Sequence, residues 1–216
     1  MKSYLSIITL ALLFLGCSNS KELAAQSKTL FDGSTFTGWE GNKDFFRIED
    51  EAIVAGDLDR KIPTNQFLCT EEKYQDFELQ LEVKFSSTEN NAGIQIRTER
   101  IPDHHEVIGY QSDIGYAGGK SVWGSLYDES RRKKFMAEAD QEIIDAILNR
   151  NDYNHYRIRC EGNQITHWIN DREVLSYVEK DDSIAKSGII CVQIHGGKAA
   201  EAWYRNIRLE TLDARR

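Results

Sequence analysis

The chain has 216 residues, of which 35 are acidic and 27 basic, so its net charge is −8 at neutral pH. This balance excludes a protein that binds nucleic acid through a broad basic surface, because such a surface must neutralise phosphates. The one basic run, residues 131–134, is predicted to be a solvated loop.

The N-terminus predicts export. Lys2 precedes an apolar stretch, Tyr4–Leu15, which is too short to span a bilayer as a helix and is typical of a signal peptide over residues 1–16. The small residue before Cys17 resembles a bacterial lipoprotein cleavage site, although Phe14 stands where Leu is usual. The resemblance implies that Cys17 carries a lipid anchor in the cell envelope, with residues 17–28 as a tether. An ordinary signal peptide cut near Ser18 is the alternative.

From residue 29 onward, polar and apolar residues alternate with the period of strands that have one buried face. The clearest case is Asp76–Phe85. Other strands are predicted at Phe45–Glu49, Ala52–Ala55, Ala92–Thr98, Val107–Ile114, Val122–Tyr127, Tyr153–Glu161, Gln164–Ile169, Glu173–Val178, Gly188–His195 and Ala202–Leu209. A helix is predicted at Asp140–Leu148, where the aliphatic residues share one side.

Turn residues separate these strands, and both Glu161–Asn163 and Asn170–Asp171 predict tight hairpins. Many short strands, one helix and no internal repeat predict a single all-β domain over residues 29–211, with a tail over residues 212–216. This length exceeds that of an immunoglobulin-type domain of about 100 residues. A larger jelly-roll sandwich with a concave sheet fits better, which is the shape of lectins and glucanases.

Cysteine spacing gives no zinc signature. Besides Cys17, the chain has Cys69, Cys160 and Cys191, and the last two lie within apolar strand patterns. Buried free thiols are the preferred interpretation. A Cys160–Cys191 disulfide is the alternative that an exported protein allows.

Several strands bury an aliphatic face and carry polar or aromatic residues on the other. The sets that share such a face are Gln95 with Arg97, Gln111 with Asp113, Gln193 with His195, Trp123 with Tyr127 and Glu129, and Trp203 with Arg205. Amides, carboxylates and Arg bind sugar hydroxyls, while aromatic rings pack on the pyranose. We therefore predict a carbohydrate site on this face; an ordinary solvent-exposed sheet is the alternative.

A series of motifs supports this prediction. They are Leu30–Gly33, Gly38–Trp39, Asn91–Arg97, Gly109–Gly115, Trp123–Glu129, Asn154–Asn163, His167–Asn170, Gln193–Gly197 and Arg205–Ile207. In this order and spacing they resemble the 3-keto-disaccharide hydrolase-type domain of exported bacterial proteins, over about residues 29 to 211. The resemblance implies a concanavalin A-like jelly-roll sandwich that cleaves glycosides or disaccharides oxidised at C3.

A ketone at C3 acidifies the C2 proton, so a base can form an enolate, the group at C1 can leave, and water can then add. No cofactor is expected in this chemistry. The candidate catalytic residues are Asp113 and His195 as base, Arg97 as enolate stabiliser and Glu129 as acid. The candidate substrate-binding residues are Gln95, Gln111, Trp123, Tyr127, Gln193 and Trp203.

Several alternatives remain open at this point. Arg97 and Asp113 could pair with each other across neighbouring strands, and Glu129 is preferred to its neighbour Asp128 on strand parity alone. The adjacent His104 and His105 are expected in a loop rather than a metal site, and a structural Ca²⁺ is not excluded. A direct two-carboxylate glycosidase and a non-catalytic carbohydrate-binding lipoprotein are the alternative functions.

Overall fold

The computed structural model describes residues 27–212. The predicted signal peptide, the lipidation site at Cys17 and most of the tether lie outside these residues. Within them, no helix is long and apolar enough to cross a membrane.

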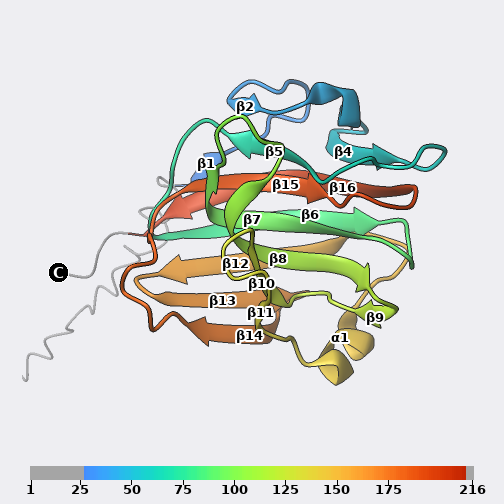
Figure 1. Ribbon diagram of the computed structural model, residues 1–216. Coiled ribbons are helices and arrows are strands. Elements are labelled where there is room, and N and C mark those ends of the chain that lie inside the picture. The colour runs from blue at the N-terminus through green and yellow to red at the C-terminus, as the bar shows by residue number, and fades with distance from the viewer. Residues whose placement is uncertain (1–26, 213–216) are drawn as a thin grey trace, which may run out of the picture.

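Two antiparallel sheets pack face to face, as predicted for a concanavalin A-like sandwich (Figure 1). Sheet A comprises β1 (Ser27–Thr29), β3 (Phe46–Glu49), β4 (Ala52–Asp57), β6 (Phe77–Phe85), β12 (Asn154–Glu161), β13 (Gln164–Ile169), β14 (Arg172–Val178) and β16 (Ala200–Thr211). Sheet B comprises β2 (Trp39–Glu40), β5 (Gln66–Thr70), β7 (Asn91–Arg100), β8 (Val107–Ala117), β9 (Lys120–Ser121), β10 (Leu126–Glu129), β11 (Phe135–Ala137) and β15 (Ile189–Ile194). A 3₁₀ turn, η2 (Lys43–Phe45), and the helix α1 (Gln141–Ile147) complete the described chain.

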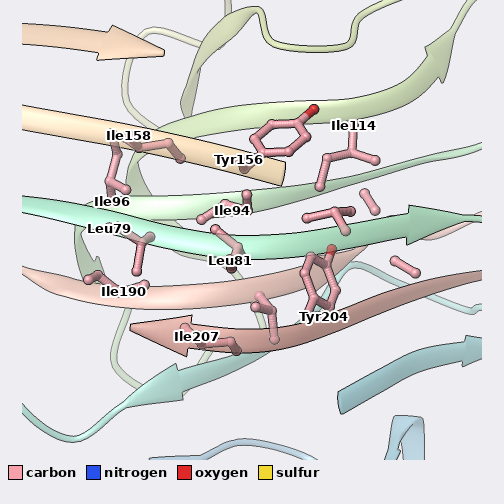
Figure 2. Close-up of a cluster of buried hydrophobic side chains, with 14 of the residues drawn as sticks. Leu79, Leu81, Ile94, Ile96, Ile114, Tyr156, Ile158, Ile190, Tyr204 and Ile207 are labelled. Carbon is pink, nitrogen blue, oxygen red and sulfur yellow. The ribbon is translucent and has the colours of Figure 1, made fainter. Parts of the chain in front are cut away.

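The core lies between the two sheets. Figure 2 shows Leu79 and Leu81 of β6 together with Ile94 and Ile96 of β7, all at most 1% exposed. Burying each such side chain contributes about 1.5–3 kcal/mol. Strand β6 alternates strictly between buried and half-buried residues, as the period-two pattern predicts. Helix α1 is also as predicted, with the Asp140 carboxylate accepting from two backbone N–H groups of its first turn.

Five short strands were missed by the period-two pattern, namely β1, β2, β5, β9 and β11. Strand β5 reads Gln-Phe-Leu-Cys-Thr and is buried on both faces, so it shows no alternation of polar and apolar residues. The predicted strand Val122–Tyr127 begins only at Leu126, because Gly124 adopts a positive φ of 74° and turns the chain.

The prediction of buried free thiols is correct for Cys160 and wrong for Cys191, whose partner lies on the missed strand β5. Cys69 on β5 and Cys191 on β15 are direct partners across the two strands and form a disulfide. Cys160 is the free, buried thiol, and burial raises its pKa to about 12. The Cys160–Cys191 alternative is therefore wrong, because Cys191 is already bonded to Cys69.

The disulfide predicts which cysteines an alkylating reagent can label and how much free energy of unfolding is lost when the bond is removed. Alkylation of the unfolded, unreduced protein should label Cys160 and leave Cys69 and Cys191 unlabelled. The double variant Cys69→Ala/Cys191→Ala should lose about 2–4 kcal/mol of unfolding free energy, because the bond joins residues 122 apart in sequence. Labelling of Cys69 without reductant would contradict this pairing.

Candidate active site

A pocket of about 210 Å³ opens on the face of sheet B that points away from sheet A. Its lining residues are Asn65, Asn91, Gln111, Asp113, Ala117, Tyr127, Glu129, Phe135 and His195. Strands β8 and β10 supply most of the polar groups, since Gln111 and Tyr127 are register partners. The pocket therefore brings together five of the predicted site residues, which come from segments far apart in the sequence.

Asp113 is the most buried carboxyl group of the pocket, with 5% of its surface exposed. Gln111 Nε2 donates a hydrogen bond of 2.5 Å to Asp113 Oδ1. Gln95 Nε2 donates to Gln111 Oε1 at 2.7 Å, and Thr98 Oγ1 donates to Gln95 Oε1 at 3.0 Å. Because each donor leads to the next acceptor, this chain fixes the Gln111 amide with its NH₂ group toward the carboxyl group.

Gly93 makes room for this arrangement. It is the register partner of Asp113 on the neighbouring strand β7. A Cβ atom at this position would lie 2.4 Å from Cδ of Gln111. The absence of a side chain at Gly93 therefore lets Gln111 lie across the strand and reach Asp113.

Two core tyrosines hold the backbone beneath the pocket. The Tyr204 hydroxyl donates to the carbonyl group of Gln193 at 2.6 Å and lies 3.2 Å from the carbonyl oxygen of Gly93. The Tyr156 hydroxyl donates to the carbonyl of Asp113 at 3.4 Å. Since both tyrosines belong to sheet A, these bonds fix the site-bearing strands of sheet B against the opposite sheet.

The two acids of the pocket keep their protons at unusually high pH. Desolvation raises the pKa of Asp113 to about 8, against the hydrogen bond from Gln111 and with the help of the charge on Glu129. Desolvation and then the charge on Glu106 raise the pKa of Glu129 to about 7. A pair of acids with such pKa values is suited to proton transfer near neutral pH.

Tyr127 and His195 complete the polar lining. Burial, followed by the nearby carboxylates, raises the pKa of Tyr127, so its hydroxyl remains a donor. The Nδ1 atom of His195 lies 2.6 Å from the carbonyl of Gly196. Because a carbonyl only accepts, Nδ1 carries the proton and Nε2 of the neutral ring is left as a potential base.

Arg97 lies outside the pocket, although the strand pattern placed it on the same face as Gln95. A β-bulge between Ile96 and Glu99 shifts the register of β7, and Arg97 adopts a φ of 49°. Its guanidinium donates to Asp76 Oδ1 at 2.8 Å and to two backbone carbonyls. The alternative pairing with Asp113 is therefore wrong, because Asp76 is the carboxylate partner of Arg97.

The other predicted binding residues are also spread over the fold. Trp123 packs in the core against Phe85, and Trp203 belongs to sheet A and packs with Ala52 and Val54. Gln95 does not line the pocket, but its amide donates a hydrogen bond to Gln111, which does. Gln193 is fully buried, and neither atom of its amide has a hydrogen-bond partner.

Strand parity distinguishes Glu129 from Asp128 correctly. Asp128 points inward, is 0% exposed, and pairs with both Arg131 and Arg132. Arg132 also pairs with Glu179 at 2.5 Å. Arg131 and Arg132 thus belong to a partly buried ion-pair network, whereas Lys133 and Lys134 are exposed as predicted. Glu129 alone of the two acids lines the pocket.

Four lining residues were not predicted as site residues, namely Asn65, Asn91, Ala117 and Phe135. Asn65 precedes the missed strand β5, and Phe135 begins the missed strand β11. Asn91 opens the family motif Asn91–Arg97, which is the sequence signal that could have identified it. Among residues 27–212, no group of three or more His, Cys, Asp or Glu side chains is arranged to hold a metal ion.

Burial of Asp113 predicts a pH-dependent stability. Its folded pKa of about 8 lies above the ordinary 3.8, so the folded state binds the proton more tightly and stability falls as pH rises from about 4 to 8. Asp113→Asn does not titrate there. Its unfolding free energy relative to wild type should therefore rise by at least about 2 kcal/mol between about pH 5 and pH 8.

Chemical denaturation at the two pH values checks this expectation. The exposed carboxylate variant Asp182→Asn serves as the control, since this side chain is 95% exposed, and it should show little change. An Asp113→Asn difference that is the same at both pH values would show that Asp113 is already ionised.

Comparison with known proteins agrees with this description of the fold. A family model described as the 3-keto-alpha-glucoside-1,2-lyase-like domain matches residues 26–210. No protein in the curated set matches the sequence. A candidate glycosyl hydrolase from Parabacteroides distasonis is 18% identical, with a TM-score of 0.67, over 91% of this chain and 98% of that one.

Two further structures share the fold. Carbohydrate-binding module CBM66 from Bacillus subtilis is 15% identical, with a TM-score of 0.59, over 81% of this chain and 96% of that one. A protein of unknown function with a galectin-like fold, also from Bacillus subtilis, is 12% identical, with a TM-score of 0.62, over 88% of this chain and 96% of that one. By the extent of the family match, the chain belongs to the 3-keto-alpha-glucoside-1,2-lyase-like domain family.

Proposed function

We propose that this protein cleaves the glycosidic bond of sugars that carry a ketone at C3, by elimination followed by hydration. The pocket on sheet B is the active site in this proposal. The observation that carries it is the pair of acids with raised pKa values, Asp113 and Glu129, beside the potential base His195. Membership of the family supports the substrate class.

The first step breaks the C2–H bond. His195 Nε2 takes the proton, and the electron pair of the bond forms a C2=C3 double bond while negative charge passes to the C3 oxygen. With Arg97 outside the pocket, this charge needs another donor. The protonated carboxyl group of Asp113 and the hydroxyl group of Tyr127 are neutral donors that could stabilise it.

The second step breaks the C1–O bond. The enolate electrons form a C1=C2 double bond, the bond pair passes to the leaving oxygen, and Glu129 gives that oxygen a proton. Water then adds across C1=C2: the ionised Glu129 takes a proton from the water as its oxygen bonds to C1, and the protonated His195 returns its proton to C2. The net reaction is hydrolysis, and both residues end in their starting protonation states.

Burial changes the role that sequence reasoning gave to Asp113. A carboxyl group with a pKa of about 8 is mostly protonated at neutral pH, so it is a better donor than base. This assignment predicts different activities for two variants. Asp113→Asn keeps a neutral donor and should retain more activity than Asp113→Ala, whereas a catalytic base would be lost equally in both.

Variants of the two proton-transfer residues test the reaction directly. His195→Ala and Glu129→Gln should each lower kcat/KM for a 3-keto-glucoside by about 10²–10⁴-fold. His155→Ala is the matched control, because His155 is 40% exposed on the opposite sheet. The unoxidised glucoside should not be cleaved, and its cleavage at a comparable rate would overturn the elimination route.

The pH profile should have a falling limb at high pH. The reaction needs Glu129 and Asp113 protonated, so kcat/KM should decrease as pH rises through about 7 to 8.

The charge on Glu106 helps to raise the pKa of Glu129. In Glu106→Gln, which can still accept the hydrogen bond from Asn65, the limb should move to lower pH; activity that rises through this range would assign the acids as bases instead.

A non-catalytic carbohydrate-binding protein is the second candidate. One observation favours it: none of the nine residues lining the pocket is a Lys or an Arg, so an enolate would depend on neutral donors alone. Wild-type protein that binds a glucoside but turns over neither the oxidised nor the unoxidised form would establish this candidate.

A further inference from the structure

A second pocket lies at the end of the sandwich where β6 and β8 finish, next to β9 and α1 (Figure 1). Its volume is about 470 Å³, which is within the roughly 300–1,000 Å³ of sites for small ligands. Three segments far apart in the sequence form it, namely residues 85–88, Tyr116 with Trp123, and the residues that follow α1. None of the residues in the proposed reaction lines it.

The lining of this pocket contains one cation and no acid. Of its nine lining residues, Arg150 alone is charged. The Arg150 guanidinium donates to Tyr116 Oη at 2.5 Å and to Asp145 Oδ1 at 2.6 Å. Because a guanidinium has five N–H donors, three remain for a ligand. The partner Asp145 is 65% exposed, and an exposed ion pair of this kind contributes little stability, so a bound anion can share Arg150.

Three further donors line the pocket without an acceptor among residues 27–212. The Tyr116 hydroxyl accepts from Arg150, and Ser87 Oγ accepts from the backbone N–H of Glu89 at 3.1 Å, so the proton of each hydroxyl remains available. Trp123 is 3% exposed, and its indole Nε1 has no hydrogen-bond partner. An indole N–H can only donate, and a buried donor without a partner costs free energy. The pocket therefore favours a group that only accepts.

Apolar side chains make up the rest of the wall. Phe85 and Trp123 meet edge to face, with ring centroids 6.3 Å apart, and Leu148 lies beside them in the lining. A flat apolar ring packs well on such a surface. The combination of this surface with a cation and several donors matches a molecule that has an apolar ring and an anionic group.

We infer that this pocket binds a small molecule in which one carboxylate is attached to an apolar ring, as in an aromatic acid. The carboxylate accepts from Arg150, Tyr116 and Trp123, and the ring packs against Phe85 and Leu148. One guanidinium matches one negative charge, whereas the second charge of a phosphate monoester would be left without a partner. The inference makes no use of the proposed reaction, so either can fail without the other.

The indole N–H of Trp123 provides a direct readout of binding. The chain has four tryptophans, so protein labelled with nitrogen-15 tryptophan gives four indole cross-peaks, and Trp123→Phe identifies the one that belongs to Trp123. Titration with benzoate or 3-phenylpropionate should move this cross-peak downfield as the N–H gains an acceptor. Benzamide, which has the same ring without the charge, should bind about tenfold more weakly than benzoate, because charge-assisted hydrogen bonds are about twice as strong as neutral ones.

Arg150→Met removes the cation and should fold normally, because this side chain is 48% exposed. Its affinity for benzoate should fall by about tenfold, and its affinity for benzamide should stay within about twofold. Arg208→Met, at an exposed arginine on β16 of sheet A, is the matched control and should change neither. An unmoved Trp123 cross-peak with both acids, equal affinities for benzoate and benzamide, or undiminished benzoate binding in Arg150→Met would each overturn the inference.

Two further ligands test the class of the anion and its source. Phenyl phosphate should bind more weakly than benzoate, and tighter binding would show that the site is built for phosphate instead. N-acetylphenylalanine mimics the C-terminus of a peptide. Weaker binding of this compound than of 3-phenylpropionate would support a free acid as the ligand, whereas tighter binding would overturn that assignment in favour of a peptide carboxylate.

Discussion

The burial of one carboxyl group, Asp113, is the constraint on which the candidate site depends. Burying an apolar side chain at this position of sheet B would cost less free energy than burying a carboxyl group, because desolvation penalises the charged form of the carboxyl group. The surroundings compensate through a chain of hydrogen bonds that runs from Thr98 through Gln95 and Gln111. The gap at Gly93 admits this chain. Desolvation outweighs the hydrogen bond from Gln111, so the acid holds its proton near neutral pH, which an exposed surface carboxylate does not do.

The sandwich explains why such a group can be held precisely. Tyr156 and Tyr204 cross the core from sheet A and bind the backbone of the strands that carry the site. The Cys69–Cys191 disulfide joins β5 to β15 on the same sheet. Rigid strands therefore position the floor of the pocket. Asn65, which lines the pocket, and its hydrogen-bond partner Glu106 come from connecting segments, where loops commonly adapt a fold to its ligand.

Local pattern was enough to predict the sandwich and five of the nine residues that line the candidate pocket. Alternation placed Gln111, Asp113 and Glu129 correctly, because β8 and β10 are regular where these residues lie. It failed for Arg97, where a bulge changes which face a side chain occupies, and bulges leave no simple signature in a sequence. It also failed for β5, whose two faces are both buried. The disulfide and the raised pKa values depend on contacts between distant segments, so no local pattern could reveal them.

The most direct test of this account is the protonation state of Asp113. Carbon-13 NMR of labelled carboxyl groups, with Asp113→Asn to assign the resonance, would follow its titration in the folded protein. The account predicts a carboxyl group that remains protonated at neutral pH and titrates near 8. A resonance that shows Asp113 ionised at about pH 6 would contradict it, because the pocket would then offer a carboxylate where the proposed reaction requires a neutral donor.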